Sequence, residues 1–214
     1  MREDRVGIPR AVEARYSAAG ARVLYRMLGL RRATAIFGDM AVAKLRGKPF
    51  GHLKPPHDER EALSRRQIAS ALMLHDALKR RLPPDRAMEL LQEVIVASTV
   101  IFLEFAVGSL SRSEIDAMSV EEREALFRRI GRRFFNATIE WGEPSDASLT
   151  FTVKRCLFPN LCRLAGAPEV APLLCKGDAV YFSEVLGTID LIRPETIAEG
   201  GTCCPFELKW KIEP

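Results

Sequence analysis

The sequence has no cysteine before Cys156 and no histidine after His75, in a chain of 214 residues. All five cysteines therefore lie in a segment that contains no histidine. No Cys-x-x-Cys pair occurs, and zinc knuckles need Cys and His at short spacings. These absences argue against the common zinc frameworks. They leave open a zinc or iron–sulfur site built from scattered cysteines, so the identity of any metal stays unknown.

Long apolar runs are also missing. The longest, from Val94 to Val107, is interrupted by Ser98, Thr99 and Glu104 and is shorter than the roughly 20 residues of a membrane span. The first ten residues lack the apolar core and cleavage site of a signal peptide. We therefore expect a cytoplasmic protein with no membrane span, whose cysteines are thiols or ligands rather than disulfides.

Aromatic residues make up 7% of the chain, and none of them interleave with basic residues in a base-stacking pattern. Residues 1–140 carry 25 Lys/Arg against 18 Asp/Glu, whereas residues 141–214 carry 7 against 10. The arginine pairs of the basic part lie among acidic residues at helical spacing, which is typical of solvated helix faces. We expect a small-molecule substrate rather than nucleic acid as partner, and the sequence leaves a homo-oligomer open.

Helical periodicity covers most of residues 1–145. It predicts a helix over 8–47 that bends or ends at Gly29 and Gly38, and a loop of prolines and glycines over 47–56. Asp58 is a predicted N-cap for a helix over 58–81, with Glu61 completing a capping box. Further helices are expected from 85 to 108, and through 133 after a cap at Ser113 or Ser119. The sequence thus predicts an array of four to five helices.

The period changes in residues 146–214, the cysteine-bearing region. Alternation predicts strands over 149–156, 189–197 and 204–212, with short helices between the first two. Glu199, Gly200 and Gly201 form a hairpin signal between the last two strands. The predicted fold is therefore α+β, with the helical array packed on a small C-terminal antiparallel sheet in one continuous globular unit.

A thiolate becomes a useful nucleophile when a cation, a base or a helix N-terminus lowers its pKa. Cys175 precedes Lys176 and lies three residues before Asp178, so a helix beginning at Gly177 or Asp178 would favour its thiolate. Asp178 could orient a base or hold a substrate ammonium, or it could serve only as an N-cap. Alternation places Cys204 on the apolar face of its strand. Cys203 is expected to face outward, and Cys162, on a short helix, is the weakest candidate.

The order of these elements is similar to that of the L-2-amino-thiazoline-4-carboxylic acid hydrolase family. The resemblance covers residues 153–206, from Cys156 through Cys-Lys-Gly-Asp178 to the glycine turn and Cys204-Pro-Phe206. It implies hydrolytic opening of a cyclic amidine or thiazoline ring by a cysteine nucleophile, with no required cofactor. By position, the resemblance points to Cys156, Cys175, Asp178 and Cys204.

Substrate-binding roles are expected for a second group of residues. Backbone N–H groups at Gly200 and Gly201 would bind a carboxylate, and Phe206 would contact the substrate. Glu104 interrupts the most apolar helix, so it either reaches a cavity or leaves at the surface. A Cys–His pair would require a histidine from the helical part, where the candidates are His52, His57 and His75. A non-catalytic small-molecule binding protein on the same scaffold remains an alternative.

Overall fold

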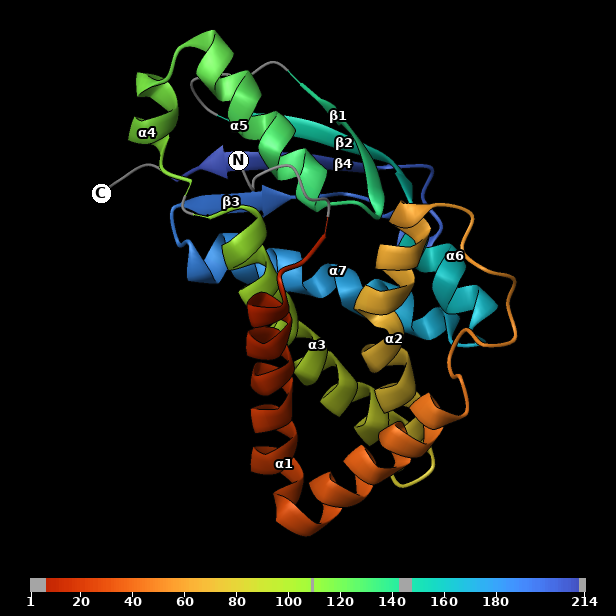
Figure 1. The fold of residues 1–214 in the computed structure, drawn as a ribbon. Helices are drawn as coiled ribbons and strands as arrows, with labels where there is room; N and C mark the ends of the chain where they lie inside the picture. Colours follow the sequence, from red (N-terminus) through yellow and green to blue (C-terminus); the bar gives the residue numbers. More distant parts are fainter. Residues whose placement is uncertain (1–6, 109, 143–147, 212–214) are drawn as a thin grey trace.

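The computed structural model describes residues 7–108, 110–142 and 148–211, and Figure 1 shows their arrangement. The helices are α1 (Arg10–Leu45), α2 (Glu59–Lys79), α3 (Pro84–Ala106), α4 (Arg112–Ala117), α5 (Val120–Arg133), α6 (Leu157–Leu164) and α7 (Ala171–Val180). The strands are β1 (Ala137–Trp141), β2 (Ser148–Cys156), β3 (Ile189–Ile192) and β4 (Cys204–Trp210). Short helical turns η1 (Pro168–Val170), η2 (Tyr181–Val185) and η3 (Ile197–Glu199) complete the described elements. The predicted α+β class is confirmed.

Helix α1 contains one sharp bend. Gly29 has φ 74° and ψ 168° within an otherwise helical run, a conformation that glycine adopts without the clash of a Cβ. The helix continues through Gly38, so the prediction of a bend or end is right at Gly29 and wrong at Gly38. After the bend, α1 turns toward the C-terminal end of α2 (Figure 1). Arg81 Nε binds Asp39 Oδ2 there at 2.6 Å.

The structure contains most of the helix caps that the sequence predicts. The Asp58 side chain accepts the Glu61 N–H at 2.8 Å and begins α2. The Glu61 carboxylate accepts the N–H of His57 at 2.9 Å rather than that of Asp58, so a complete capping box does not form. Of the two predicted serines, Ser119 caps α5 in a full capping box with Glu122. Within the described residues, no helix has both the length and the apolarity needed to cross a membrane.

The sheet is antiparallel in the order β1-β2-β4-β3. Strand β1 was missed in the sequence, because five residues directly after a helix give too little alternation to separate them from it. The strand predicted over 189–197, which is β3 in the structure, ends at Ile192, since Pro194 follows and cannot donate to a ladder. The predicted pairing of β3 with β4 is confirmed, and Ile189 lies opposite Trp210.

Figure 1 shows α7 passing between the sheet and the helices α1, α2 and α3. One buried cluster joins α1, α2 and α3 to α6 and α7, and a second joins the end of α3 and α5 to the sheet. Helix α7 packs closely on α3, because a Cβ at Gly177 would overlap the side-chain carbons of Thr99. The region between sheet and helices is therefore where α3, α7 and the strand ends meet.

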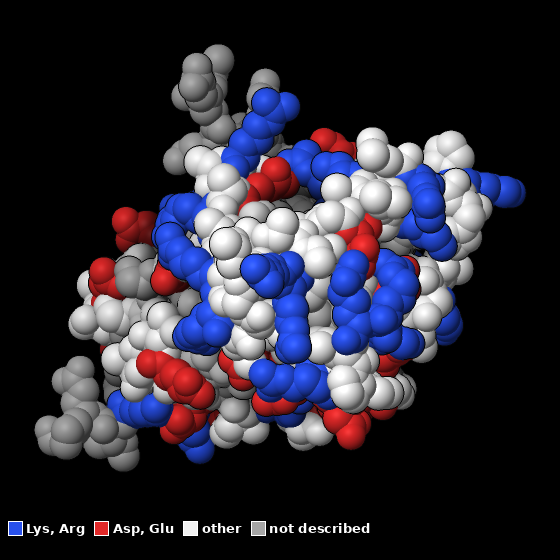
Figure 2. Space-filling model, turned by 90° about the horizontal axis from the view of Figure 1, so that it is seen from below, with Lys and Arg blue, Asp and Glu red and all other residues white. Residues whose placement is uncertain are grey.

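The face that contains the bend of α1 is rich in Lys and Arg, with acidic side chains among them (Figure 2). Besides the Arg81–Asp39 pair, Arg80 binds Asp76 at 3.1 Å one helical turn away. Such exposed pairs contribute little to stability. The acidic members of these pairs nevertheless reduce the positive charge of this face.

Candidate active site

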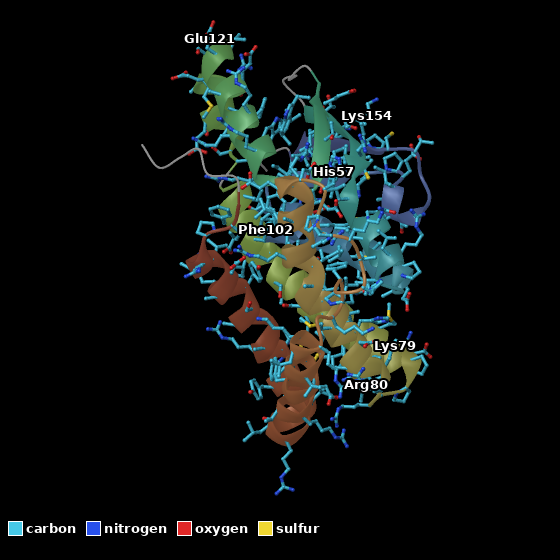
Figure 3. All side chains as sticks on the ribbon, turned by 45° about the vertical axis from the view of Figure 1, so that its right-hand side comes forward. His57, Lys79, Arg80, Phe102, Glu121 and Lys154 are labelled. Carbon is cyan, nitrogen blue, oxygen red and sulfur yellow. The ribbon has the colours of Figure 1, made fainter. Side chains whose placement is uncertain are left out.

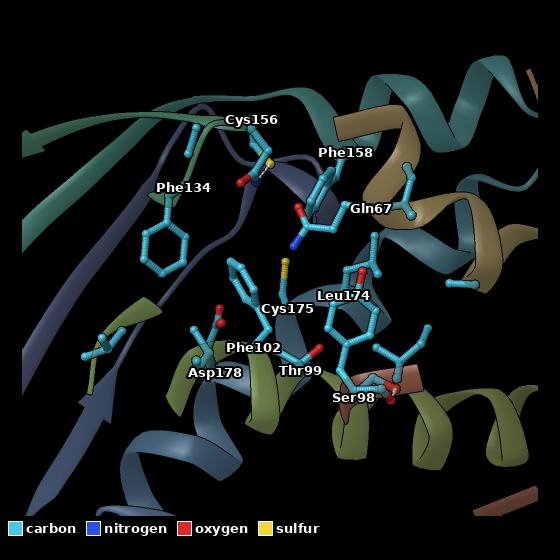
Figure 4. Close-up of a pocket in the computed structure, with 18 of the residues that line it drawn as sticks. Gln67, Ser98, Thr99, Phe102, Phe134, Cys156, Phe158, Leu174, Cys175 and Asp178 are labelled. Atoms are coloured by element: carbon cyan, nitrogen blue, oxygen red, sulfur yellow. Dashed lines mark hydrogen bonds between the residues drawn. The ribbon is translucent and has the colours of Figure 1, made fainter. Parts of the chain in front are cut away.

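A cavity of about 320 Å³ lies between the sheet and the helices. Three of the five cysteines line it, and each comes from a different element: Cys156 from the end of β2, Cys175 from α7 and Cys204 from the start of β4. Asp178 of α7 and Arg193 after β3 complete this part of the wall. Figure 4 shows Cys156 and Cys175 on two sides of the open space.

Cys156 is the last residue of β2 and the residue before α6, so its sulfur lies near a helix N-terminus. Asn136 Nδ2 donates to Cys156 Sγ at 3.5 Å. Burial raises the pKa of the Cys156 thiol, whereas the backbone N–H of Phe158 and the Asn136 amide lower it. The thiol is half-buried and has two donors that favour its thiolate.

Cys204 points inward, as its strand alternation predicts, and is 7% exposed. The backbone N–H of Ile197 donates to Cys204 Sγ at 3.2 Å. Burial raises the pKa of the Cys204 thiol, while the Ile197 N–H and the positive charge of Arg193 lower it. Two neighbouring groups thus favour the Cys204 thiolate, whereas the low exposure of Cys204 limits its contact with a ligand.

Cys175 differs from the other two cysteines of the cavity. It lies in the middle of α7, which begins at Ala171, so the predicted helix start at Gly177 or Asp178 is wrong. The absence of a side chain at Gly177 allows the close packing on α3 and does not mark a helix end. Cys175 Sγ faces the Ala171 carbonyl at 3.9 Å. Burial and the nearby Asp178 carboxylate raise the pKa of the Cys175 thiol far above its ordinary value.

Asp178 is inside α7 and is not an N-cap. Its Oδ2 accepts a hydrogen bond from Arg193 Nη1 at 2.6 Å, and Arg193 Nη2 donates to the Cys175 carbonyl at 3.0 Å. The guanidinium also lies over the ring of Phe206, 5.0 Å from its centre. Burial raises the pKa of the Asp178 carboxyl, and Arg193 opposes that shift. The pair places one acid and one cation in the cavity wall.

The other predicted substrate-binding residues separate into two groups. Phe206 lines the cavity. The N–H groups of Gly200 and Gly201 are used within their own turn, by the carbonyls of Ile197 and Thr196 at 3.3 and 2.9 Å, so the structure does not present them to a carboxylate.

Glu104 leaves α3 at the surface, where 40% of its side chain is exposed, and it pairs with Arg15 at 3.3 Å. It is not among the residues that line the cavity. Glu104 therefore lies at the surface, which is one of the two placements that the sequence left open.

The three histidines are all described, and none lines the cavity. His57 lies at the start of α2 with 91% of its side chain exposed (Figure 3). His52 Nε2 is 3.1 Å from the carbonyl of Leu164. His75 is buried toward the other end of α2, where its Nε2 lies 3.2 Å from Glu169 Oε1. The cysteines of the cavity therefore have no histidine partner from the helical part.

The two cysteines without a predicted catalytic role, Cys162 and Cys203, lie outside the cavity. Cys162 is completely buried in the helical core. Cys203 Sγ donates toward Glu195 Oε1 at 3.6 Å in an exposed position. Among the described residues, no three Cys, His, Asp or Glu side chains form a group that could hold a metal ion.

Sequence reasoning missed three polar residues of the cavity wall: Gln67 of α2, Asn136 before β1 and Arg193. Arg193 lies inside the strand predicted over 189–197 but directly after the observed β3. The proline that follows it could have placed it at a strand end, where a charged residue is a usable signal. Gln67 and Asn136 give no comparable signal, because a lone amide on a helix or loop is common.

One comparison with known proteins bears on this site. The family model described as L-2-amino-thiazoline-4-carboxylic acid hydrolase matches residues 62–208, from within α2 to within β4. The matched span includes Gln67 and the five residues Cys156, Cys175, Asp178, Arg193 and Cys204, and it does not include α1. No curated protein matches the chain.

Proposed function

The chain belongs to the L-2-amino-thiazoline-4-carboxylic acid hydrolase family, and from this premise we propose that it opens the ring of a thiazoline or related cyclic amidine by hydrolysis in the cysteine-lined cavity. One observation carries the proposal. Three cysteines and a buried acid–base pair, which come from distant parts of the chain, line a single cavity. A cavity of about 320 Å³ accommodates a small ring.

Cys156 is the attacking residue in this proposal. A nucleophile has to be reachable by the substrate and has to form a thiolate. Cys175 is half-buried but faces a carbonyl, which disfavours the thiolate. Cys204 has an N–H donor but is 7% exposed. Cys156 combines partial exposure with the Asn136 and Phe158 donors.

The reaction proceeds in two stages. The Cys156 sulfur adds to the ring carbon between nitrogen and sulfur, and the thiol proton passes to the ring nitrogen. Cleavage of the ring C–S bond, with protonation of the departing sulfur, leaves an isothiourea on the enzyme and frees the thiol of the substrate. Water then adds to the same carbon and expels Cys156 as a thiol. The product is a ring-opened urea, and one water is consumed overall.

Asp178 and Arg193 bind and orient the substrate in this scheme. Asp178 Oδ2 is occupied by Arg193, so Oδ1 is the oxygen that would accept an amidine N–H. Burial raises the pKa of Asp178, which also suits this carboxylate to taking the thiol proton of Cys156 and passing it to the ring nitrogen. Arg193 supplies a positive charge for a substrate carboxylate and keeps Asp178 in place.

The test is incubation of the purified protein with 2-aminothiazoline-4-carboxylate and with thiazolines and cyclic amidines that lack the carboxylate or the ring sulfur. Mass spectrometry of the products should show the gain of one water. Mass spectrometry of the intact protein after rapid quenching should show an adduct that maps to Cys156. If no compound of the panel gains water, the hydrolase proposal fails.

Serine variants assign the attacking residue. Cys156→Ser is expected to lower kcat by at least about a thousandfold and to abolish the adduct. Cys203→Ser is the matched control, because Cys203 lies outside the cavity. An adduct that persists in Cys156→Ser and disappears in Cys204→Ser or Cys175→Ser would move the role to that residue. Full activity in all three variants would reject a cysteine nucleophile.

A further inference from the structure

The cavity has two chemically different parts. The cysteines, Asp178 and Arg193 lie where α7 meets the sheet. The part that extends among α1, α2 and α3 has mostly apolar walls, which include Leu24, Phe37, Met40, Ile68, Leu74 and Val94. In Figure 4, Ser98 and Thr99 of α3 lie across the open space from Cys156, so the cavity continues from the cysteines toward α3. Ser98 is already used, because its hydroxyl donates to the Tyr16 carbonyl at 3.1 Å.

The volume exceeds what the polar part of the cavity needs. About 320 Å³ corresponds to about ten water molecules at about 30 Å³ each. It also falls at the lower end of the range of pockets that hold drug-sized ligands. A single thiazoline ring at the cysteines would leave the walls among α1, α2 and α3 without a ligand contact. Apolar walls favour an apolar group there, because such a group leaves water on binding.

Gln67 lies where the two parts meet. Its side chain comes from α2 and points into the open space beside Phe158, facing Cys175 (Figure 4). Within the described residues, its buried Oε1 has no hydrogen-bond partner. A buried amide oxygen without a partner is unfavourable, and natural proteins usually avoid it. An acceptor kept in this state on a cavity wall is suited to an N–H group of a ligand.

We infer that this chain acts on an amphipathic cyclic amidine. An N–H of the polar ring is accepted by Gln67, and an apolar substituent on the ring lies among α1, α2 and α3. The inference rests on the proposed function and specifies its substrate class. Helix α1, which supplies part of the apolar wall, lies outside the span that the family model matches. The family match therefore does not itself account for the share of the apolar wall that α1 supplies.

The test uses 2-aminothiazoline-4-carboxylate and two series of derivatives, with linear alkyl chains on the exocyclic nitrogen or at ring carbon 5. Both Kd by calorimetry and kcat/KM are measured. We expect one series to gain about fourfold in affinity for each added methylene until the apolar part is full. Affinity that stays constant or falls in both series would overturn the inference. If affinity rises without turnover, the cavity binds an amphipathic cyclic amidine as inferred, whereas the hydrolase proposal fails.

A pair of alanines on α2 provides matched variants. Ala71 lines the cavity, whereas Ala62, on the same helix, is exposed. Ala71→Leu should remove the gain from the longer chains and leave the affinity for the unsubstituted ring within about twofold. Ala62→Leu should behave as the wild type. If Ala71→Leu keeps the full dependence on chain length, the substituent lies elsewhere and the inference is wrong.

Gln67→Met tests the polar contact with a side chain of similar length. We expect Kd for the unsubstituted ring to rise about tenfold, which corresponds to the loss of one hydrogen bond. The melting temperature should stay the same or rise, because the variant removes an unpaired buried acceptor. Gln67→Glu, which keeps an acceptor, should restore most of the affinity. A lower melting temperature with unchanged Kd would show that Gln67 is structural and would overturn this contact.

Discussion

Arg193 Nη1 and Asp178 Oδ2 lie 2.6 Å apart and connect the segment after β3 to the last turn of α7. Only 12% of the arginine side chain and 21% of the aspartate side chain are exposed. The same guanidinium holds the Cys175 carbonyl and lies over Phe206. One cation thus fixes the relative positions of a helix, a loop and a strand around the cavity.

Arg193→Met should destabilise the protein by about 3 kcal/mol, because it leaves the Asp178 carboxylate buried without its partner. Urea unfolding at neutral pH measures the change. The double variant Arg193→Met, Asp178→Leu should recover part of the loss, since no uncompensated charge remains. A single variant as stable as the wild type would show that Asp178 is neutral or solvated in the folded protein.

Gly177→Ala should destabilise the protein by about 1–3 kcal/mol, although alanine favours helices by up to about 1 kcal/mol over glycine. The added methyl would overlap Thr99 and push α7 away from α3, so activity should fall as well. Gly38→Ala is the control, since Gly38 is helical, exposed and has open space at its Cβ. It should stabilise the protein by about 0.5–1 kcal/mol. Equal effects of the two substitutions in thermal unfolding would contradict this packing.

Burial raises the pKa of Cys162 from its ordinary 9.0 to about 12. Between these pH values the unfolded chain releases this proton and the folded chain keeps it. The free energy of unfolding should therefore fall as pH rises, and Cys162 should contribute about 1.4 kcal/mol per pH unit. Cys162→Ala should flatten the slope measured from pH 9 to 11, whereas Cys203→Ala should leave it unchanged. Parallel slopes for the two variants would refute the shift.

Treatment with a strong chelator should leave ring opening unchanged, because the proposed chemistry uses side chains of the chain alone. Metal analysis of the anaerobically purified protein provides the second measurement. Stoichiometric zinc or iron whose removal abolishes activity would contradict the cysteine nucleophile. It would show instead that the scattered cysteines bind a catalytic metal ion.

The fold class could be predicted from the sequence, because helical and strand periodicity record it. The three cysteines of the cavity came from the family resemblance, and alternation supported the inward position of Cys204. The predicted end of the strand over 189–197 was wrong for a local reason, the proline at 194. The start of α7 was wrong for a tertiary reason. Gly177 resembles a helix terminator in the sequence, whereas in the fold its missing side chain allows contact with Thr99, which is far away in sequence.

The polar partners were the least predictable part of the site. Arg193 reaches Asp178 only because β3 and α7 are brought together by the fold, and a separation of 15 positions in the sequence follows no spacing rule. Asn136 and Cys156 are likewise brought together by the fold, where β1 pairs with β2. Which side chains meet across elements depends on strand register and helix packing, and neither can be read from a single sequence.

The bend at Gly29 has a consequence for how substrate range can change. Leu24 before the bend and Phe37 and Met40 after it all line the cavity, so one continuous segment forms two of its walls. Exchanging residues 10–45 between relatives would then transplant both walls together and leave the cysteines untouched. New substituent preferences could thus be acquired as a single exchangeable unit, independently of the catalytic chemistry.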